Sequence, residues 1–206
     1  MNITLIGMTA AGKSTLGKSA AEKLGFEFFD LDHEVEEFVG MEISEMVQKI
    51  ADDKDNKDLE EGEAWTMDTL NSFFMDTYDR LNDKSNTIIA TGGFFGIYND
   101  FKNTENVFFI DISQEVFINR IIEAKKDIDH KDNKNRRIVQ LPISKATEQY
   151  QDRHETYLNK ATQVFKVNNQ IDMKKLSGKV VGIINSLVKK SNQQTSTKQD
   201  NSNKIT

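Results

Sequence analysis

The chain has 206 residues, of which 37% are hydrophobic and 29% are charged, and its formal net charge at pH 7 is −6. This length fits one domain with a sizeable core, and the acidic balance argues against nucleic acid or a membrane surface as the main partner. No apolar run approaches the roughly 20 residues of a membrane-spanning helix, and the absence of cysteine excludes disulfides and thiolate metal sites. We therefore expect a cytoplasmic protein.

The first predicted elements are a strand over residues 2–6 and a helix over residues 14–24, joined by a glycine-rich loop. The loop fits the pattern G-x-x-x-x-G-K-[ST] of the phosphate-binding P-loop, and its fixed positions are Gly7, Gly12, Lys13 and Ser14. The two glycines let successive backbone N–H groups point at one phosphate. Lys13 supplies positive charge to the β- and γ-phosphates, and the Ser14 hydroxyl is a ligand for Mg²⁺. Because strand, loop and helix follow in the order that the motif needs, a nucleotide site is preferred over an incidental turn.

The second predicted strand, over residues 26–31, ends at a pair of carboxylates. Asp30 would lie at its carboxyl end and Asp32 just beyond it. In open α/β sheets, ligands bind at those ends of the strands. Asp-x-Asp is also common in turns and at helix caps, so the pair by itself leaves both a binding role and a structural role open.

The spacing of apolar residues then predicts helices. Two short helices are expected over residues 33–50, with a break at Gly40, and a further helix over residues 62–81. The charged stretch 51–61 between them favours an exposed loop or a helix extension over a metal site. Trp65 is expected to pack against the protein rather than to serve as a stacking platform.

A third predicted strand covers residues 87–91 and is followed directly by Gly92 and Gly93. Two glycines at the carboxyl end of a strand suggest that a ligand or the P-loop approaches the backbone closely. A plain turn is the alternative.

The rest of the chain continues the alternation of strands and helices. The further elements that we predict are a strand over 106–112, a helix through 116–122, a helix over 142–161, a strand over 163–167 and a helix over 173–188. Five strands with helices between them predict a parallel sheet covered on both faces. The charged segment 124–137 reads as a surface loop, and the polar stretch from Lys189 onward as a disordered tail. The histidines, His33, His130 and His154, lack metal-ligand spacing and are expected to face solvent.

Taken together, these motifs resemble those of the shikimate kinases, a family within the nucleoside-monophosphate-kinase-like group of P-loop proteins. After its P-loop this family has the motifs F-x-D-x-D, G-x-S-I, T-G-G and R-x-x-x-Y-x-x-x-A, in that order. The matching residues are Phe28, Asp30 and Asp32, then Gly40 and Ile43, then Thr91, Gly92 and Gly93, and last Arg153, Tyr157 and Ala161. The resemblance extends from Asn2 to about Leu187.

The resemblance implies an α/β fold of three layers, αβα, around a five-stranded parallel sheet of order 2-3-1-4-5. It implies a P-loop kinase domain over residues 1–188, with a lid at about 124–141 that closes over ATP, before the disordered polar tail over 189–206. The implied reaction moves the γ-phosphoryl group of ATP, with Mg²⁺, to a hydroxyl of a small carboxylate-bearing acceptor. The first candidate is shikimate, giving shikimate 3-phosphate in the shikimate pathway of aromatic amino acid biosynthesis. We expect a monomer whose partner is this small molecule.

The site residues implied by the resemblance form four groups. The nucleotide would be bound by Gly7, Ala11, Gly12, Lys13, Ser14, Thr15 and Arg120. The acceptor would be bound by Asp32, Gly92, Gly93 and Arg153, and Mg²⁺ by Ser14 and, through water, by Asp30. The catalytic residues would be Lys13, Asp32 and Arg136. Asp32 would hold the acceptor's hydroxyls and accept a proton, and the planar guanidinium of Arg153 suits two parallel hydrogen bonds to a carboxylate.

The departures from the family pattern cluster on the acceptor side. Where the family has a second carboxylate-binding arginine, this chain has Thr66 or Met67, and Phe94 replaces the third glycine of G-G-G. Arg136 or Arg137 takes the place of the family's lid arginine. The proline that follows this arginine in the family is absent from this chain. Three functions stay open: a shikimate kinase, a kinase of the same fold for another hydroxy compound, and a non-catalytic ATP-binding regulatory module. The intact P-loop and Asp-x-Asp pair argue against the third.

Overall fold

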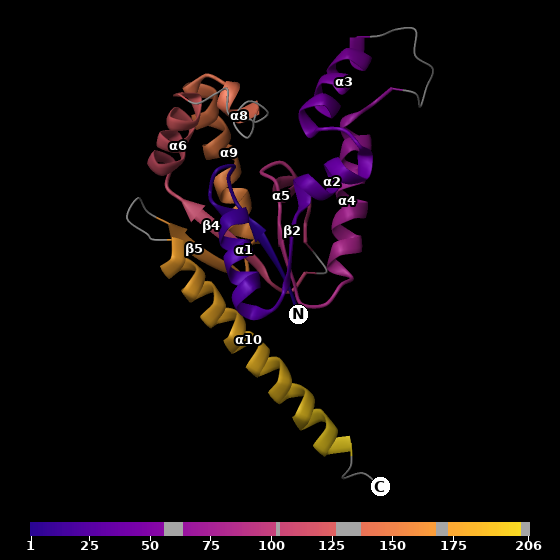
Figure 1. The fold of residues 1–206 in the computed structure, drawn as a ribbon, viewed down its shortest axis with the longest axis vertical. Coiled ribbons are helices and arrows are strands. Elements are labelled where there is room, and N and C mark those ends of the chain that lie inside the picture. The colour runs from indigo at the N-terminus through magenta and orange to yellow at the C-terminus, as the bar shows by residue number, and fades with distance from the viewer. Residues whose placement is uncertain (56–63, 102–103, 127–136, 168–172, 203–206) are drawn as a thin grey trace.

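A five-stranded parallel sheet forms the centre of the protein in the computed structural model (Figure 1). The structure describes residues 1–55, 64–101, 104–126, 137–167 and 173–202. The strands are β1 (Asn2–Ile6), β2 (Glu27–Asp30), β3 (Thr87–Ala90), β4 (Val107–Ile112) and β5 (Gln163–Val167). Their order across the sheet is β2-β3-β1-β4-β5 and every pairing is parallel, so the predicted fold class and strand order are confirmed.

The helices described by the structure connect these strands and cover them. They are α1 (Lys13–Leu24), α2 (Leu31–Val39), α3 (Ile43–Asp55), α4 (Met67–Asn82), α5 (Phe95–Tyr98), α6 (Gln114–Lys126), α8 (Arg137–Gln140), α9 (Ile143–Lys160) and α10 (Met173–Ser202). The break predicted at Gly40 is confirmed, because this residue ends α2 with φ 73° and donates its N–H to the Glu36 carbonyl at 2.9 Å. The short α5 and α8 were not predicted, since four residues are too few to show helical periodicity.

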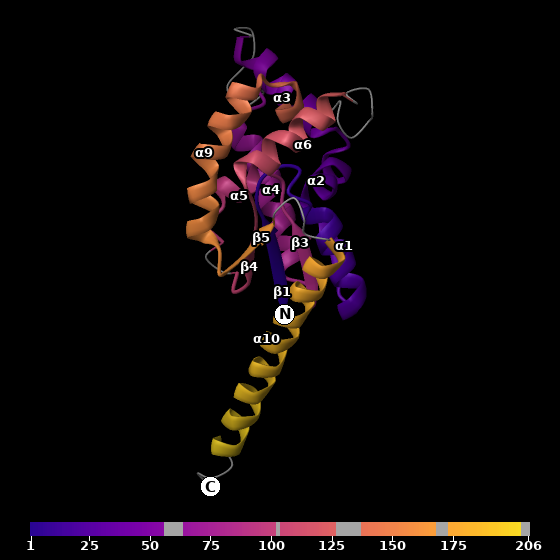
Figure 2. The same ribbon diagram turned by 90° about the vertical axis from the view of Figure 1, so that its left-hand side faces the viewer.

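Both faces of the sheet are covered by helices (Figures 1 and 2). Consecutive residues of a strand point to opposite faces, and β1 shows how this works. Thr4 shares a hydrogen bond of 2.8 Å with the Tyr78 hydroxyl of α4, whereas a Cβ on Gly17 of α1 would lie 3.1 Å from Leu5. Strands buried on two faces read as continuous apolar runs, as β3 and the first four residues of β4 do here. The sheet therefore holds the carboxyl ends of its strands at one rigid edge.

Helix α10 packs beside α1 on one face of the sheet. Its inner side carries Leu176, Val180 and Ile184, which are buried at the four-residue spacing of a helix. Beyond them α10 continues to Ser202 and projects away from the sheet (Figure 1), over part of the stretch where the sequence predicts a disordered tail. Disorder of 189–206 stays a prediction. No helix in the described ranges combines the length and the apolar character that crossing a membrane requires.

Candidate active site

The loop between β1 and α1 folds around the side chain of Lys13. Its ammonium donates to the carbonyls of Gly7 and Met8, both at 2.9 Å, and the residue is only 7% exposed. Gly7 and Gly12 have φ of 142° and 91°, values that favour residues without a Cβ. Helix α1 begins at Lys13, so its first N–H groups lie at the loop, where a helix N-terminus attracts anions. The geometry is that of a phosphate-binding loop.

Two oxygen ligands lie next to this loop. The Ser14 hydroxyl at the start of α1 donates to Oδ2 of Asp30 at the end of β2, at 2.5 Å. Mg²⁺ prefers oxygen ligands and usually keeps several waters, completing its shell with one or two protein groups and the phosphates of its substrate. The described ranges contain no cluster of three or more histidine, aspartate or glutamate side chains fit for a metal. The pair of Ser14 and Asp30 thus fits Mg²⁺ held together with a nucleotide.

The two glycines after β3 allow close approach of other parts of the site. A Cβ on Gly92 would overlap both carboxylate oxygens of Asp32, which lies in the first turn of α2. A Cβ on Gly93 would lie 2.8 Å from the Thr9 hydroxyl of the phosphate-binding loop. The close approach predicted here is therefore confirmed. Gly92 makes room for the Asp32 carboxylate, and Gly93 makes room for the loop.

Helix α9 brings two side chains to the same backbone carbonyl. Arg153 Nη1 donates to the Gly93 carbonyl at 3.4 Å, and the Tyr157 hydroxyl donates to it at 2.6 Å. Tyr157 is fully buried. Burial raises the pKa of its phenol far above the ordinary value, with Arg153 lowering it and Asp32 raising it by smaller amounts. The phenol therefore stays protonated, and it fixes the glycine loop against α9 beside Arg153 and Asp32.

We expect Tyr157→Phe to lower the free energy of unfolding by about 1–2 kcal/mol, because a partly buried carbonyl loses its shorter hydrogen bond while the ring stays in place. Urea unfolding followed by circular dichroism measures the change. Tyr98→Phe is the matched control, since Tyr98 is 62% exposed. Equal losses in the two variants would contradict a specific role for the Tyr157 hydroxyl.

Of the two arginines that the resemblance implies for the nucleotide and the lid, nucleotide-binding Arg120 falls in the described part of the chain and catalytic Arg136 does not. Its Nη1 donates to the Ala10 carbonyl of the phosphate-binding loop at 2.6 Å, and burial lowers the pKa of its guanidinium. Helix α6 thus places Arg120 over the loop. Arg136 lies outside the described residues, as does most of the predicted lid. Arg137, the other candidate for the lid arginine, is the first residue of α8.

The residues that depart from the family pattern have structural contacts. Thr66 caps α4, because its side chain accepts the N–H of Thr69 at 3.1 Å, and Met67 is 42% exposed. The Phe94 ring packs against Tyr98 and Phe74, with centroids 4.5 and 6.4 Å away. Neither Thr66 nor Met67 carries a charge that would replace an arginine.

Two further sequence-based expectations concern residues around the site. The expected packing of Trp65 is confirmed, because its ring packs on Phe73 with centroids 5.7 Å apart. Solvent exposure is confirmed for His33, whose side chain is 66% exposed, and His130 lies outside the described residues. For His154 the expectation was wrong. Its Nε2 lies 2.8 Å from Asp111 Oδ1 and its ring stacks on Tyr150, because both α9 residues face the sheet, a direction that the sequence pattern did not reveal.

Comparisons with known proteins agree with this geometry. A family model described as shikimate kinase matches residues 9–63. The shikimate kinase of Aquifex aeolicus is 29% identical over 76% of this chain and 82% of its own length. The shikimate kinase of Clostridium botulinum (strain Okra) is 30% identical over 61% of this chain and 68% of its own.

Solved structures give the same result. The structure of shikimate kinase from Acinetobacter baumannii in complex with shikimate has a TM-score of 0.69 and 27% identity, covering 90% of this chain and 93% of that one. The crystal structure of the Aquifex aeolicus enzyme has a TM-score of 0.64 and 23% identity, covering 91% and 98%, and supports the fold alone. From the matching P-loop, the sheet order and these relatives, we conclude that the chain belongs to the shikimate kinase family, whose members are small-molecule kinases that use ATP with Mg²⁺.

Proposed function

We propose that this protein transfers the γ-phosphoryl group of ATP to a hydroxyl of shikimate, giving shikimate 3-phosphate. One observation carries the proposal: a carboxylate, a glycine loop and a guanidinium, supplied by Asp32, Gly93 and Arg153, meet beside the phosphate-binding loop. These groups match a small acceptor that bears hydroxyls and a carboxylate. The similar enzyme from Acinetobacter baumannii, whose structure contains shikimate, supports shikimate as this acceptor. The proposal includes a monomer in the cytoplasm.

On the nucleotide side, the chain supplies positive charge and backbone donors. The N–H groups at the start of α1 bind the phosphates, Lys13 turns its ammonium from the loop carbonyls to the β- and γ-phosphates, and Arg120 flanks the base. Ser14 and Asp30 would hold Mg²⁺, and the bound ion would neutralise charge on the phosphates. The family resemblance assigns to Arg136 a further positive charge that stabilises the transferred group.

On the acceptor side, the chain orients the substrate and accepts one proton from its reacting hydroxyl. Arg153 binds the carboxylate of the acceptor by two parallel hydrogen bonds, and the ring of the acceptor lies against Gly92 and Gly93. Asp32 accepts a hydrogen bond from the reacting hydroxyl and takes up its proton as the oxygen attacks the γ-phosphorus. Catalysis is then positioning and charge stabilisation, with no covalent enzyme intermediate.

A second candidate is a kinase of the same fold for another hydroxy acid or polyol. The specific observation that favours it is the neutral side chain at Thr66 or Met67, together with the ring of Phe94 at the end of the glycine loop. Loss of one charged partner of a buried carboxylate costs about 2–5 kcal/mol of binding free energy. Whether shikimate still binds therefore depends on whether another group in the pocket replaces the missing arginine.

A coupled assay of ADP release with Mg·ATP, with and without shikimate, tests the proposal. We expect saturable stimulation by shikimate at KM values between about 1 μM and 1 mM. Stimulation by another hydroxy acid or polyol, but not by shikimate, would favour the second candidate. ATP binding by calorimetry without stimulation by any acceptor would favour the non-catalytic module.

The contact between Gly92 and Asp32 gives another prediction. In Gly92→Ala, the new methyl group overlaps the Asp32 carboxylate. We expect kcat/KM for the acceptor to fall by about a hundredfold, a loss that a misplacement of about 1 Å can cause. Steady-state kinetics at saturating ATP measures this. Gly182→Ala in α10 is the control, because a Cβ there meets nothing within 4 Å. Unchanged kcat/KM in Gly92→Ala would argue against catalysis through Asp32.

A further inference from the structure

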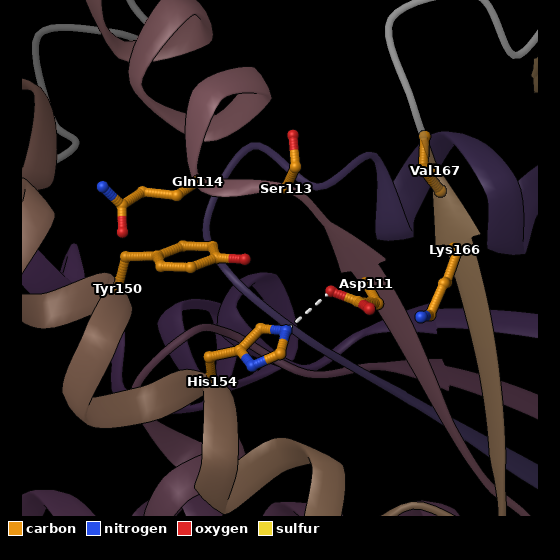
Figure 3. Close-up of a pocket in the computed structure, with 7 residues that line it drawn as sticks. All are labelled: Asp111, Ser113, Gln114, Tyr150, His154, Lys166 and Val167. Carbon is orange, nitrogen blue, oxygen red and sulfur yellow. Dashed lines mark hydrogen bonds and ion pairs between the residues drawn. The ribbon is translucent and has the colours of Figure 1, made fainter.

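A cavity of about 460 Å³ lies beside α9, and its lining includes none of the residues assigned to the acceptor (Figure 3). Arg153 and His154 are consecutive residues of α9, so their side chains leave the helix about 100° apart. Arg153 reaches Gly93, whereas His154 reaches Asp111 on β4 and enters the cavity lining. The other lining residues come from the start of α6, from α9 and from the end of β5: Ser113, Gln114, Tyr150, Lys166 and Val167. The cavity is thus separate from the acceptor side of the active site.

The lining carries one negative and one positive charge. Asp111 and Lys166 are direct neighbours in the pairing of β4 with β5, and Figure 3 shows both side chains at the cavity, with Lys166 directed toward Asp111. One carboxylate oxygen of Asp111 is bonded to His154 at 2.8 Å, which leaves the other oxygen as an acceptor. A simple anion would meet repulsion from Asp111, and a simple cation would meet repulsion from Lys166. The arrangement favours a ligand that carries both charges.

The remaining lining groups complete this pattern. The Ser113 oxygen accepts the N–H of Val116 at 3.3 Å, so its O–H proton can be donated to a ligand. The Tyr150 hydroxyl donates to the Ile112 carbonyl at 2.8 Å and its ring is stacked on His154, so what this residue offers the cavity is apolar ring carbon. Figure 3 shows this ring on one side and Val167 on the other. The lining therefore adds a hydroxyl donor and apolar side chains to the two charges.

We propose that this cavity binds a small zwitterion, an ammonium carboxylate of the size of a free amino acid. The ammonium bonds to Asp111, the carboxylate bonds to Lys166, and an apolar side chain lies between Tyr150 and Val167. The volume is in the usual range for small-molecule sites, which begins at about 300 Å³. The proposal makes no use of the phosphoryl transfer reaction, so its test is independent of the test of the proposed function.

Calorimetric titration of the full chain with three related probes tests the charge pattern. L-phenylalanine carries both charges, 3-phenylpropionate lacks the ammonium, and phenethylamine lacks the carboxylate. We expect L-phenylalanine to bind at least about tenfold more tightly than either analogue, because each analogue leaves one charged lining group without its partner. L-valine serves as a smaller zwitterion. Absence of saturable binding of both amino acids up to about 10 mM would overturn the proposal.

Two isosteric or near-isosteric variants locate the binding. Asp111→Asn keeps an acceptor for His154 but removes the negative charge, and Lys166→Gln removes the positive charge. We expect each to weaken binding of L-phenylalanine by about tenfold, with Lys179→Gln, an exposed lysine of α10, as the matched control and thermal unfolding as the check of folding. Binding that both variants retain, or that Arg153→Gln alone abolishes, would place the ligand elsewhere and overturn the proposal.

Discussion

Replacing Lys13 by methionine is expected to lower kcat for phosphoryl transfer by about 10²–10³-fold. Lys13 is buried, and its ammonium is held by two loop carbonyls at 2.9 Å each. Its positive charge therefore lies beside the phosphate site before any nucleotide binds. Methionine has nearly the same length and keeps the packing, but it removes the charge that stabilises the transferred phosphoryl group. Release of ADP at saturating Mg·ATP and acceptor measures the loss.

Lys18→Met is the matched control for this variant. Lys18 lies on the same helix, about 1.4 turns beyond Lys13, is exposed, and has its ammonium 5.8 Å from the centre of the Phe28 ring. Its removal changes the net charge by the same amount, and we expect kcat within about twofold of the unmodified protein, as for surface substitutions in general. Unaltered turnover in Lys13→Met would contradict the assignment of the loop.

The sheet was predictable because its strands are short apolar runs bounded by clear breaks. The bounds predicted for β1 and β5 are those observed, and the other three strands differ by at most one residue at each end. Parallel strands buried on both faces give such runs, and the P-loop fixes which strand is first. Helix α4 was less well predicted at its start. Thr66 caps it, so it begins five residues later than apolar spacing alone suggests.

The sequence predicted only in part which residues come together in the site. The P-loop is local, since its residues follow one another in the chain, and its chemistry can be read from the pattern. The contact of Arg153 with the Gly93 carbonyl joins residues 60 positions apart, and no local pattern reveals it. Here the resemblance to a family supplied what the residues alone left open, namely whether the glycines formed a plain turn.

The cavity beside α9 shows what neither the pattern nor the resemblance indicated. Asp111 and Lys166 become neighbours through strand pairing, and His154 joins them from a helix. Each residue taken alone reads as a polar surface position. Their common location depends on which side of α9 faces the sheet, and a helix with polar residues on several sides does not specify this. Tyr150 and Tyr157, one on each side of His154 in the chain, settle that orientation by burial.

Replacing Arg153 by alanine is expected to raise KM for a carboxylate-bearing acceptor by at least about a hundredfold, the equivalent of roughly 3 kcal/mol. KM for ATP should change by less than about threefold, because Lys13 and Arg120 hold the nucleotide from other elements. Initial rates measured across ranges of both substrates separate the two constants. Arg80→Ala, an exposed arginine in the last turn of α4, is the control and should leave both unchanged.

The hydrogen bonds around Gly93 make this variant interpretable. In Arg153→Ala the Gly93 carbonyl keeps its shorter bond from Tyr157, at 2.6 Å, so the glycine loop stays in place and the missing guanidinium alone accounts for weaker acceptor binding. Arg153→Lys keeps the charge but provides no planar pair of donors, and it should restore only part of the affinity. Equal increases in KM for ATP and for the acceptor would mean that Arg153 acts by holding α9 against the loop. The acceptor carboxylate would then have to bind to another group.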